Sequence, residues 1–95
     1  MKTFNLEQQT PPEIAQEIAA NVRKRRKEHK LSQQELAKRS GVSLGSLKRF
    51  ENRHEISLVS LIKIAIALDC EDDFAALFVR KHYRSIQEVI DEQGR

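Results

Sequence analysis

Apolar residues recur at helical spacing near the start of the chain. Ile14, Ile18 and Val22 stand four residues apart, which places them in one stripe along a helix. Thr10 and Glu13 have the spacing of a capping box, and the proline between them suits the first helical position. We therefore predict a long helix that starts there and runs through the basic sequence RKRRKEHK to about residue 29 or 30.

Two short helical patterns follow, at residues 32–39 and 43–52. Ser32 begins the first as the N-cap of a second capping box, and Ser43 can cap the second. Gly41 stands between them, where the backbone needs a positive φ that glycine adopts at no steric cost. This spacing is typical of a helix-turn-helix, whose second helix lies in the major groove of DNA.

A further helix is predicted at residues 57–69, and it carries two apolar stripes. The stripe expected in the core consists of Leu58, Leu61, Ala65 and Leu68. The second stripe consists of Val59, Ile62 and Ile66. Because a surface helix of a small monomer rarely needs both, we expect the second stripe to be covered by the C-terminal segment, the N-terminal arm or a second subunit.

The C-terminal part predicts two short helical segments. The first begins at the acidic residues after position 70, with Phe74, Leu77 and Phe78 as its expected buried edge. The second begins with a capping box at Ser85 and has Ile86, Val89 and Ile90 on one face. We divide the chain into an N-terminal arm at 1–10, a DNA-binding domain at 11–80 and a C-terminal helical tail at 81–95.

Composition and charge support this interpretation. A chain of 95 residues with 39% hydrophobic and 5% aromatic residues suits a small all-α bundle. The net charge of +3 is unevenly distributed: residues 21–54 contain eleven Lys or Arg against three acids, and the remainder is acidic. A basic block of this kind attracts polyanions, and its overlap with the two-helix motif favours DNA as the partner.

Several classes of function are not supported. No apolar stretch is long enough to span a membrane, no signal peptide precedes the first helix, and a single cysteine, Cys70, forms no internal disulfide, so we expect a cytoplasmic protein. His29, His54 and His82 do not have a metal-ligand spacing with Cys70, and no catalytic motif is present. We therefore expect neither enzymatic activity nor a metal or other cofactor, and no membrane partner.

The string LSQQELAKRSGVS, continued by SLKRFEN and SLVSLIKIAIAL, resembles the lambda-repressor-like helix-turn-helix family, also called the XRE or Cro/phage-repressor type. The resemblance covers about residues 18–78. It implies a five-helix bundle, here with an N-terminal arm and a short extra C-terminal helix, that binds double-stranded DNA as a homodimer.

The resemblance also implies roles for individual residues. Arg26 would form a structural ion pair with Glu51, and Gln33 would bond a DNA phosphate. The remaining DNA-binding candidates, on or beside the second motif helix, are Ser43, Leu44, Gly45, Ser46, Lys48, Arg49 and Arg53.

Two of these candidates depart from the side chains common in the family. Neither Leu44 nor Gly45 can make the bidentate hydrogen bonds that specify adenine or guanine. Leu44 could touch a thymine methyl group, and Gly45 could admit close approach of the backbone or be silent. Arg49 is then the best candidate for a direct contact with a base edge, and Ser46 and Lys48 would add supporting contacts. DNA shape would supply much of the specificity.

Two functions of different class remain. The first is a repressor that binds a palindromic operator as a homodimer. The second is an antitoxin that binds a toxin protein and autoregulates its operon, because the ending FVRKHYRSIQEVIDEQ resembles small HipB-like antitoxins encoded beside HipA-type kinase toxins. A restriction–modification controller is a weaker third interpretation.

Overall fold

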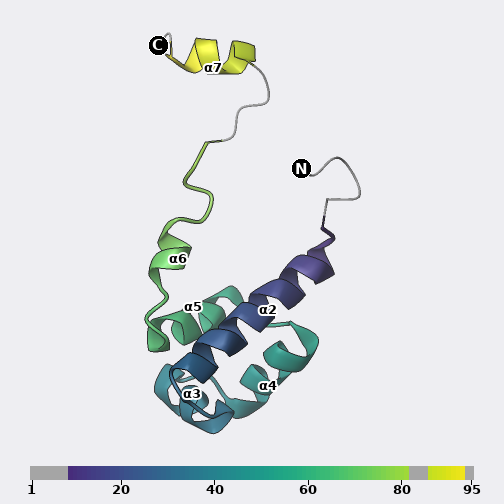
Figure 1. Cartoon of the computed structure of the whole chain (residues 1–95), viewed down its shortest axis with the longest axis vertical. Coiled ribbons are helices and arrows are strands. Elements are labelled where there is room, and N and C mark those ends of the chain that lie inside the picture. The colour runs from purple at the N-terminus through teal and green to yellow at the C-terminus, as the bar shows by residue number, and fades with distance from the viewer. Residues whose placement is uncertain (1–8, 82–85, 94–95) are drawn as a thin grey trace.

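Six helices and no strand occur in residues 9–81 and 86–93, the parts of the chain that the computed structural model describes (Figure 1). They are α2 (Pro11–Glu28), α3 (Gln33–Ser40), α4 (Leu44–Arg53), α5 (Leu58–Ala67), α6 (Asp72–Ala75) and α7 (Ile86–Gln93). The predicted all-α architecture is confirmed for these residues.

The helix termini follow from their capping residues. The predicted capping boxes of Thr10 with Glu13 and of Ser32 with Glu35 are both present, and hydrogen bonds from these cap residues lower the pKa of each glutamate. Gly41 ends α3 with a φ of 78°, the left-handed conformation predicted for it. These caps define the turn that orients α4 against α3.

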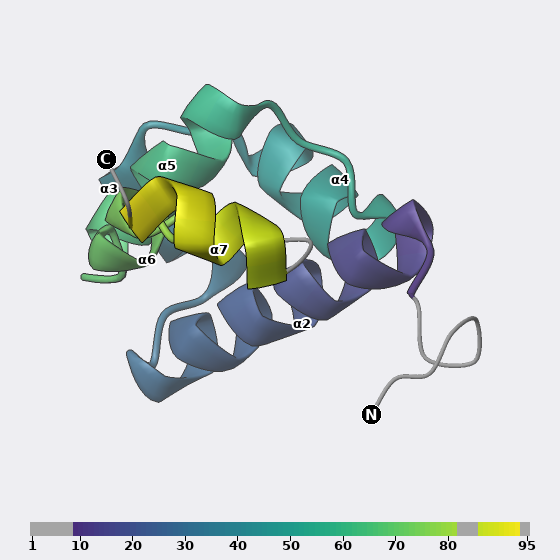
Figure 2. The ribbon, with the colours of Figure 1, turned by 90° about the horizontal axis from the view of Figure 1, so that it is seen from above.

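Helix α3 lies at the centre of the bundle. The closest helix pairs are α3 with α5, α3 with α4, and α2 with α4, and Figure 2 shows α2 along one side of the group formed by α3, α4 and α5. The buried cluster that joins them consists of Leu31, Leu36, Ala37, Val42, Leu47, Ile64 and Leu68. The apolar residues of the helix-turn-helix are thus buried around α3, which leaves one face of α4 free.

The predicted core stripe of α5 is partly wrong. Leu58 is 61% exposed because it lies in the first turn of α5, while Ile64, assigned to neither stripe, is fully buried. The second stripe is largely uncovered in the single chain: Val59 is 64% and Ile66 is 54% exposed, whereas Ile62 is half-buried.

The predicted buried edge after residue 70 is also partly wrong. Helix α6 ends at Ala75, and Phe78 lies beyond it with a φ of 59° and 95% of its surface exposed. Phe74 is half-buried, whereas Leu77 remains 49% exposed. The four-residue helix is too short to turn all three side chains toward the bundle.

The C-terminal helix α7 lies beyond α6, away from α2–α5 (Figure 1). Lys81 forms an ion pair with Glu92 of this helix, with Nζ 3.0 Å from Oε1. The predicted cap at Ser85 and most of the predicted arm at 1–10 lie outside the described residues. Among the described helices, none combines the length and apolarity that crossing a membrane requires.

Candidate nucleic-acid interface

A buried ion pair fixes the base of α4. Arg26 of α2 donates from Nε to Glu51 Oε2 at 2.8 Å and from Nη2 to Oε1 at 3.1 Å, and the side chains are only 10% and 3% exposed. The pair implied by the family resemblance is therefore present, in a bidentate geometry. The remaining guanidinium nitrogen donates to the carbonyl of Leu31 at 2.9 Å, so Arg26 also holds the loop before α3.

Gln33 joins this network. Its side-chain Nε2 donates to Glu51 Oε1 at 3.0 Å, and the residue is half-buried. The carboxylate of Glu51 thus connects α2, α3 and α4. The NH2 group of the Gln33 side chain has a second N–H, so Gln33 could donate to a phosphate while it keeps its hydrogen bond to Glu51.

The turn between α3 and α4 is closed by Ser43. Its hydroxyl accepts from the backbone N–H of Ser46 at 3.1 Å and donates to the Ser46 hydroxyl at 2.9 Å. Both serines are exposed at the N-terminus of α4. The free backbone N–H groups of this first turn favour an anion there.

The outer face of α4 holds most of the candidates named from the sequence. Gly45, Ser46, Lys48, Arg49 and Arg53 are all exposed, whereas Leu47 and Phe50 are buried on the opposite face. The exposed side chains lie on a helix whose base is fixed by the Arg26–Glu51 pair. This arrangement is suited to insertion into a groove.

Leu44 differs from the other candidates. It is half-buried and packs against the core cluster, so only part of its side chain remains available to a thymine methyl group. Its neighbour Gly45 lies in open surroundings, since a Cβ placed there would meet no atom within 4 Å. The glycine is therefore not required by packing within the protein.

Arg49 has an intramolecular partner that the sequence did not reveal. Its Nε lies 3.4 Å from Oε1 of Glu55, and both side chains are largely exposed. Glu55 belongs to the loop after α4, where no periodic pattern indicates which way a side chain points. The charge that we expect to read a base is thus partly balanced in the free protein.

A basic cleft adjoins the C-terminal end of α4. It measures about 450 Å³ and is lined on α2 by Arg23, Lys24 and Lys27 and on the other side by Glu51 and His54. These three cations are not among the residues predicted to contact DNA, although their i, i+3 and i+4 spacing places them on one helix face. They add positive potential beside α4.

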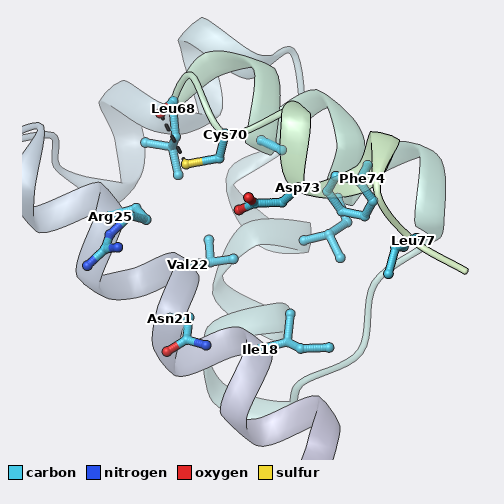
Figure 3. A pocket seen from close by; sticks show the side chains of 11 residues that line it. Ile18, Asn21, Val22, Arg25, Leu68, Cys70, Asp73, Phe74 and Leu77 are labelled. Atoms are coloured by element: carbon cyan, nitrogen blue, oxygen red, sulfur yellow. Dashed lines mark hydrogen bonds between the residues drawn. The ribbon is translucent and has the colours of Figure 1, made fainter. Parts of the chain in front are cut away.

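A second hollow, the apolar groove, lies between α2 and the segment after α5 (Figure 3). Its volume is about 470 Å³, and its lining includes Cys70. Burial, and then the nearby Asp73 carboxylate, raises the pKa of the Cys70 thiol, whose Sγ donates to the Leu68 carbonyl at 3.3 Å. This agrees with a packed cysteine rather than a reactive thiolate.

Comparison with known proteins supports the motif. A family model described as Helix-turn-helix matches residues 22–74, which include all of α3, α4 and α5. No curated protein and no solved structure matches the chain. The matched segment begins within α2 and ends within α6, so α7 lies outside it.

Proposed function

Because the chain belongs to the lambda-repressor-like helix-turn-helix family, we propose that it is a transcriptional repressor that binds a palindromic operator as a homodimer. Family membership makes it a DNA-binding transcription regulator, and repression, the palindrome and the dimer are the parts that we propose. The observation that carries the proposal is the exposed outer face of α4, anchored through Glu51 to α2 and α3.

Binding begins with electrostatic docking on the phosphate backbone. The contributing groups are the N-termini of α3 and α4, at Ser32 and Ser43, and the basic side chains of residues 21–54. These contacts position the protein without reading sequence. Arg53 and Gln33 belong to this group, Gln33 through the second N–H of its side-chain amide or through its backbone N–H.

Sequence is then read by the outer face of α4. Arg49 donates to guanine O6 and N7, with Ser46 and Lys48 assisting, and Gly45 lets the helix backbone approach the base edges. Leu44 contributes a partial apolar contact because the core holds part of its side chain. Since few side chains can read bases directly, the deformability of the operator supplies the rest of the specificity.

Two copies are needed to contact two half-sites. In a dimer the two α4 helices would enter successive major grooves about 34 Å apart. In the second stripe of α5, Val59 and Ile66 are exposed and Ile62 is half-buried, which supports self-association because soluble monomers seldom leave such a stripe uncovered. Bound at a promoter, the dimer would exclude the polymerase.

Selection of bound duplexes from a random pool, with sedimentation of the same sample, tests the proposal. We expect an inverted repeat with half-sites about 10 base pairs apart and a protein dimer in solution. We also expect affinity to fall roughly a thousandfold between about 50 and 200 mM salt, the loss expected for about six phosphate contacts. A single unrepeated site bound by a monomer would contradict the palindrome and the dimer, and a flat salt dependence would contradict the docking step.

A second candidate function is that of an antitoxin. The observation in its favour is that Phe78 and Val79 are 95% and 70% exposed just beyond the family match. Apolar side chains presented there could bind a toxin protein while α4 represses the operon. Co-purification with the product of the adjacent gene, lost in the variant Phe78→Ser, would support the antitoxin, and growth inhibition by that product would identify the toxin.

A further inference from the structure

The apolar groove is built from three parts of the fold. Ile18 and Val22 of α2 face Phe74 of α6 and Leu77 across the hollow (Figure 3), and α5 contributes Leu61 and Ala65. Helices α2 and α5 are not among the closest helix pairs, which leaves this space open. Ile18 is 42% and Leu77 is 49% exposed, so apolar surface is presented to solvent along the groove.

Helix α7 carries an apolar face that could pack in this groove. Its sequence has apolar residues at positions 86, 89 and 90, the spacing of one helix face, and Ile90 is 54% exposed. An isolated helix of eight residues is not stable in water, so α7 needs an apolar surface to pack on. The groove offers such a surface, with a volume of about 470 Å³ and a lining that is mostly apolar.

We infer that the groove receives helix α7 of a second copy of this chain, an exchange that completes the homodimer of the proposed function and rests on it. The chain's own α7 does not occupy the position: after Leu77 the backbone turns at Phe78, where φ is 59°, and leads to a helix that lies beyond α6 (Figure 1). In a two-fold symmetric dimer, each chain would place its α7 in the groove of the other chain, so that both grooves are filled.

Two further observations favour a second copy. Around α5, the exposed Leu58 lies between Leu61 of the groove and Ile62 of the second stripe, so apolar surface runs from the groove to that stripe. A partner chain that lies over the second stripe is therefore already beside the groove. Charge offers a second contact, because Ile86–Gln93 contains three acids and no Lys or Arg, and Arg25 lines the groove beside a single acid, Asp73.

Site-directed cross-linking between two differently tagged full-length chains tests the exchange. Both chains carry Cys70→Ser, which removes the natural thiol but keeps a hydroxyl that can donate to Leu68. One chain then carries Ile18→Cys in the groove and the other carries Ile90→Cys on α7. The matched control replaces Ile18→Cys by Gln16→Cys, an exposed position two residues earlier that faces the basic cleft.

We expect mild oxidation to link the two tags for the Ile18 and Ile90 pair at least tenfold more efficiently than for the Gln16 control. A single chain that carries both cysteines and forms only an internal link, at monomer mass, would show that α7 covers its own groove and would overturn the inference. Equal linking with the control would overturn it as well. Sedimentation of the same samples separates the two proposals: a dimer without the link refutes only the exchange, whereas a monomer refutes the proposed dimer.

Discussion

The guanidinium of Arg49 lies against the carboxylate of Glu55, with Nε 3.4 Å from Oε1. The side chain best placed to read a base is therefore engaged with an acid of the following loop before DNA arrives. Because both groups are largely exposed, the pair contributes little to stability, about 1 kcal/mol or less. Its consequence lies in binding, since DNA has to replace Glu55 as the partner of Arg49.

Arg49→Ala should weaken binding to the selected operator more than binding to random DNA. Loss of a bidentate contact with guanine costs about 1–3 kcal/mol, whereas loss of a phosphate contact costs the same on every sequence. The measurement is the ratio of the two dissociation constants at fixed salt. Arg39→Ala, which removes an exposed cation on α3, is the control, and equal losses for Arg49→Ala on both DNAs would make Arg49 a phosphate contact.

Glu55→Gln should increase operator affinity by up to about fivefold, because Arg49 no longer has to leave a charged partner. The gain should disappear in the Arg49→Ala background, which a double-mutant cycle measures. Glu71→Gln removes an exposed acid at the start of α6 and serves as the control for net charge. If both variants gain equally, the effect is one of overall charge and the Arg49–Glu55 contact has no specific role.

Arg26→Met should lower the free energy of unfolding by about 3–5 kcal/mol, because it leaves Glu51 buried without its cation. Arg25→Met is a matched control on the next residue, since Arg25 pairs with Glu28 on the surface and its loss should cost well under about 1 kcal/mol. Adding Glu51→Leu to Arg26→Met should restore much of the stability. Chemical denaturation measures all three, and similar values for the two arginine variants would refute the buried role.

Gly45→Ala should stabilise the protein and weaken its binding to DNA. The new methyl group meets no atom of the protein, and glycine within a helix costs about 0.5–1 kcal/mol relative to alanine. Gly41→Ala should have the opposite effect on stability, a loss of about 1–2 kcal/mol, because φ there is 78°. Unchanged operator affinity in Gly45→Ala would show that the glycine is silent in recognition.

Val59→Glu and Ile66→Glu should each dissociate the dimer. Both side chains are more than half exposed on α5, so the new carboxylate should disturb the fold of a single chain little. In the dimer the same carboxylate would be buried between the two subunits, which costs free energy. Lys63→Glu introduces the same acid at an exposed polar position of α5 and should leave the dimer intact. Light scattering distinguishes the outcomes, and a dimer that survives both substitutions would exclude the second stripe from the interface.

Local sequence signals predicted most of the helix-turn-helix. A cap acts through hydrogen bonds to backbone groups within one turn, so Ser32 with Glu35 marked the start of α3 directly. The positive φ of Gly41 follows from the absence of a Cβ and needs no tertiary partner. The exposure of Lys48 and Arg49 opposite Leu47 and Phe50 follows from helical periodicity.

The same reasoning failed where burial depends on which helices meet. Periodicity gave α5 two equivalent apolar rows, and only packing against α3 selected Ile64 as fully buried and left Leu58 exposed. Likewise, Phe78 was assigned to a buried edge because its spacing is helical, but α6 ends before it. Apolar spacing describes a face of a helix and not the partner that covers it.

By itself, the sequence determined the capped starts of α2, α3, α4 and α5, the left-handed turn at Gly41 and the positive charge around the motif, because these depend on local backbone chemistry and on residue type. Tertiary structure alone decided that Gln33 joins the Arg26–Glu51 pair, that Glu55 engages Arg49, and that α2 and the segment after α5 leave an apolar groove between them. These contacts join residues that are distant in sequence or lie in irregular loops, so their existence depends on how helices pack and where loops turn, which periodicity does not encode.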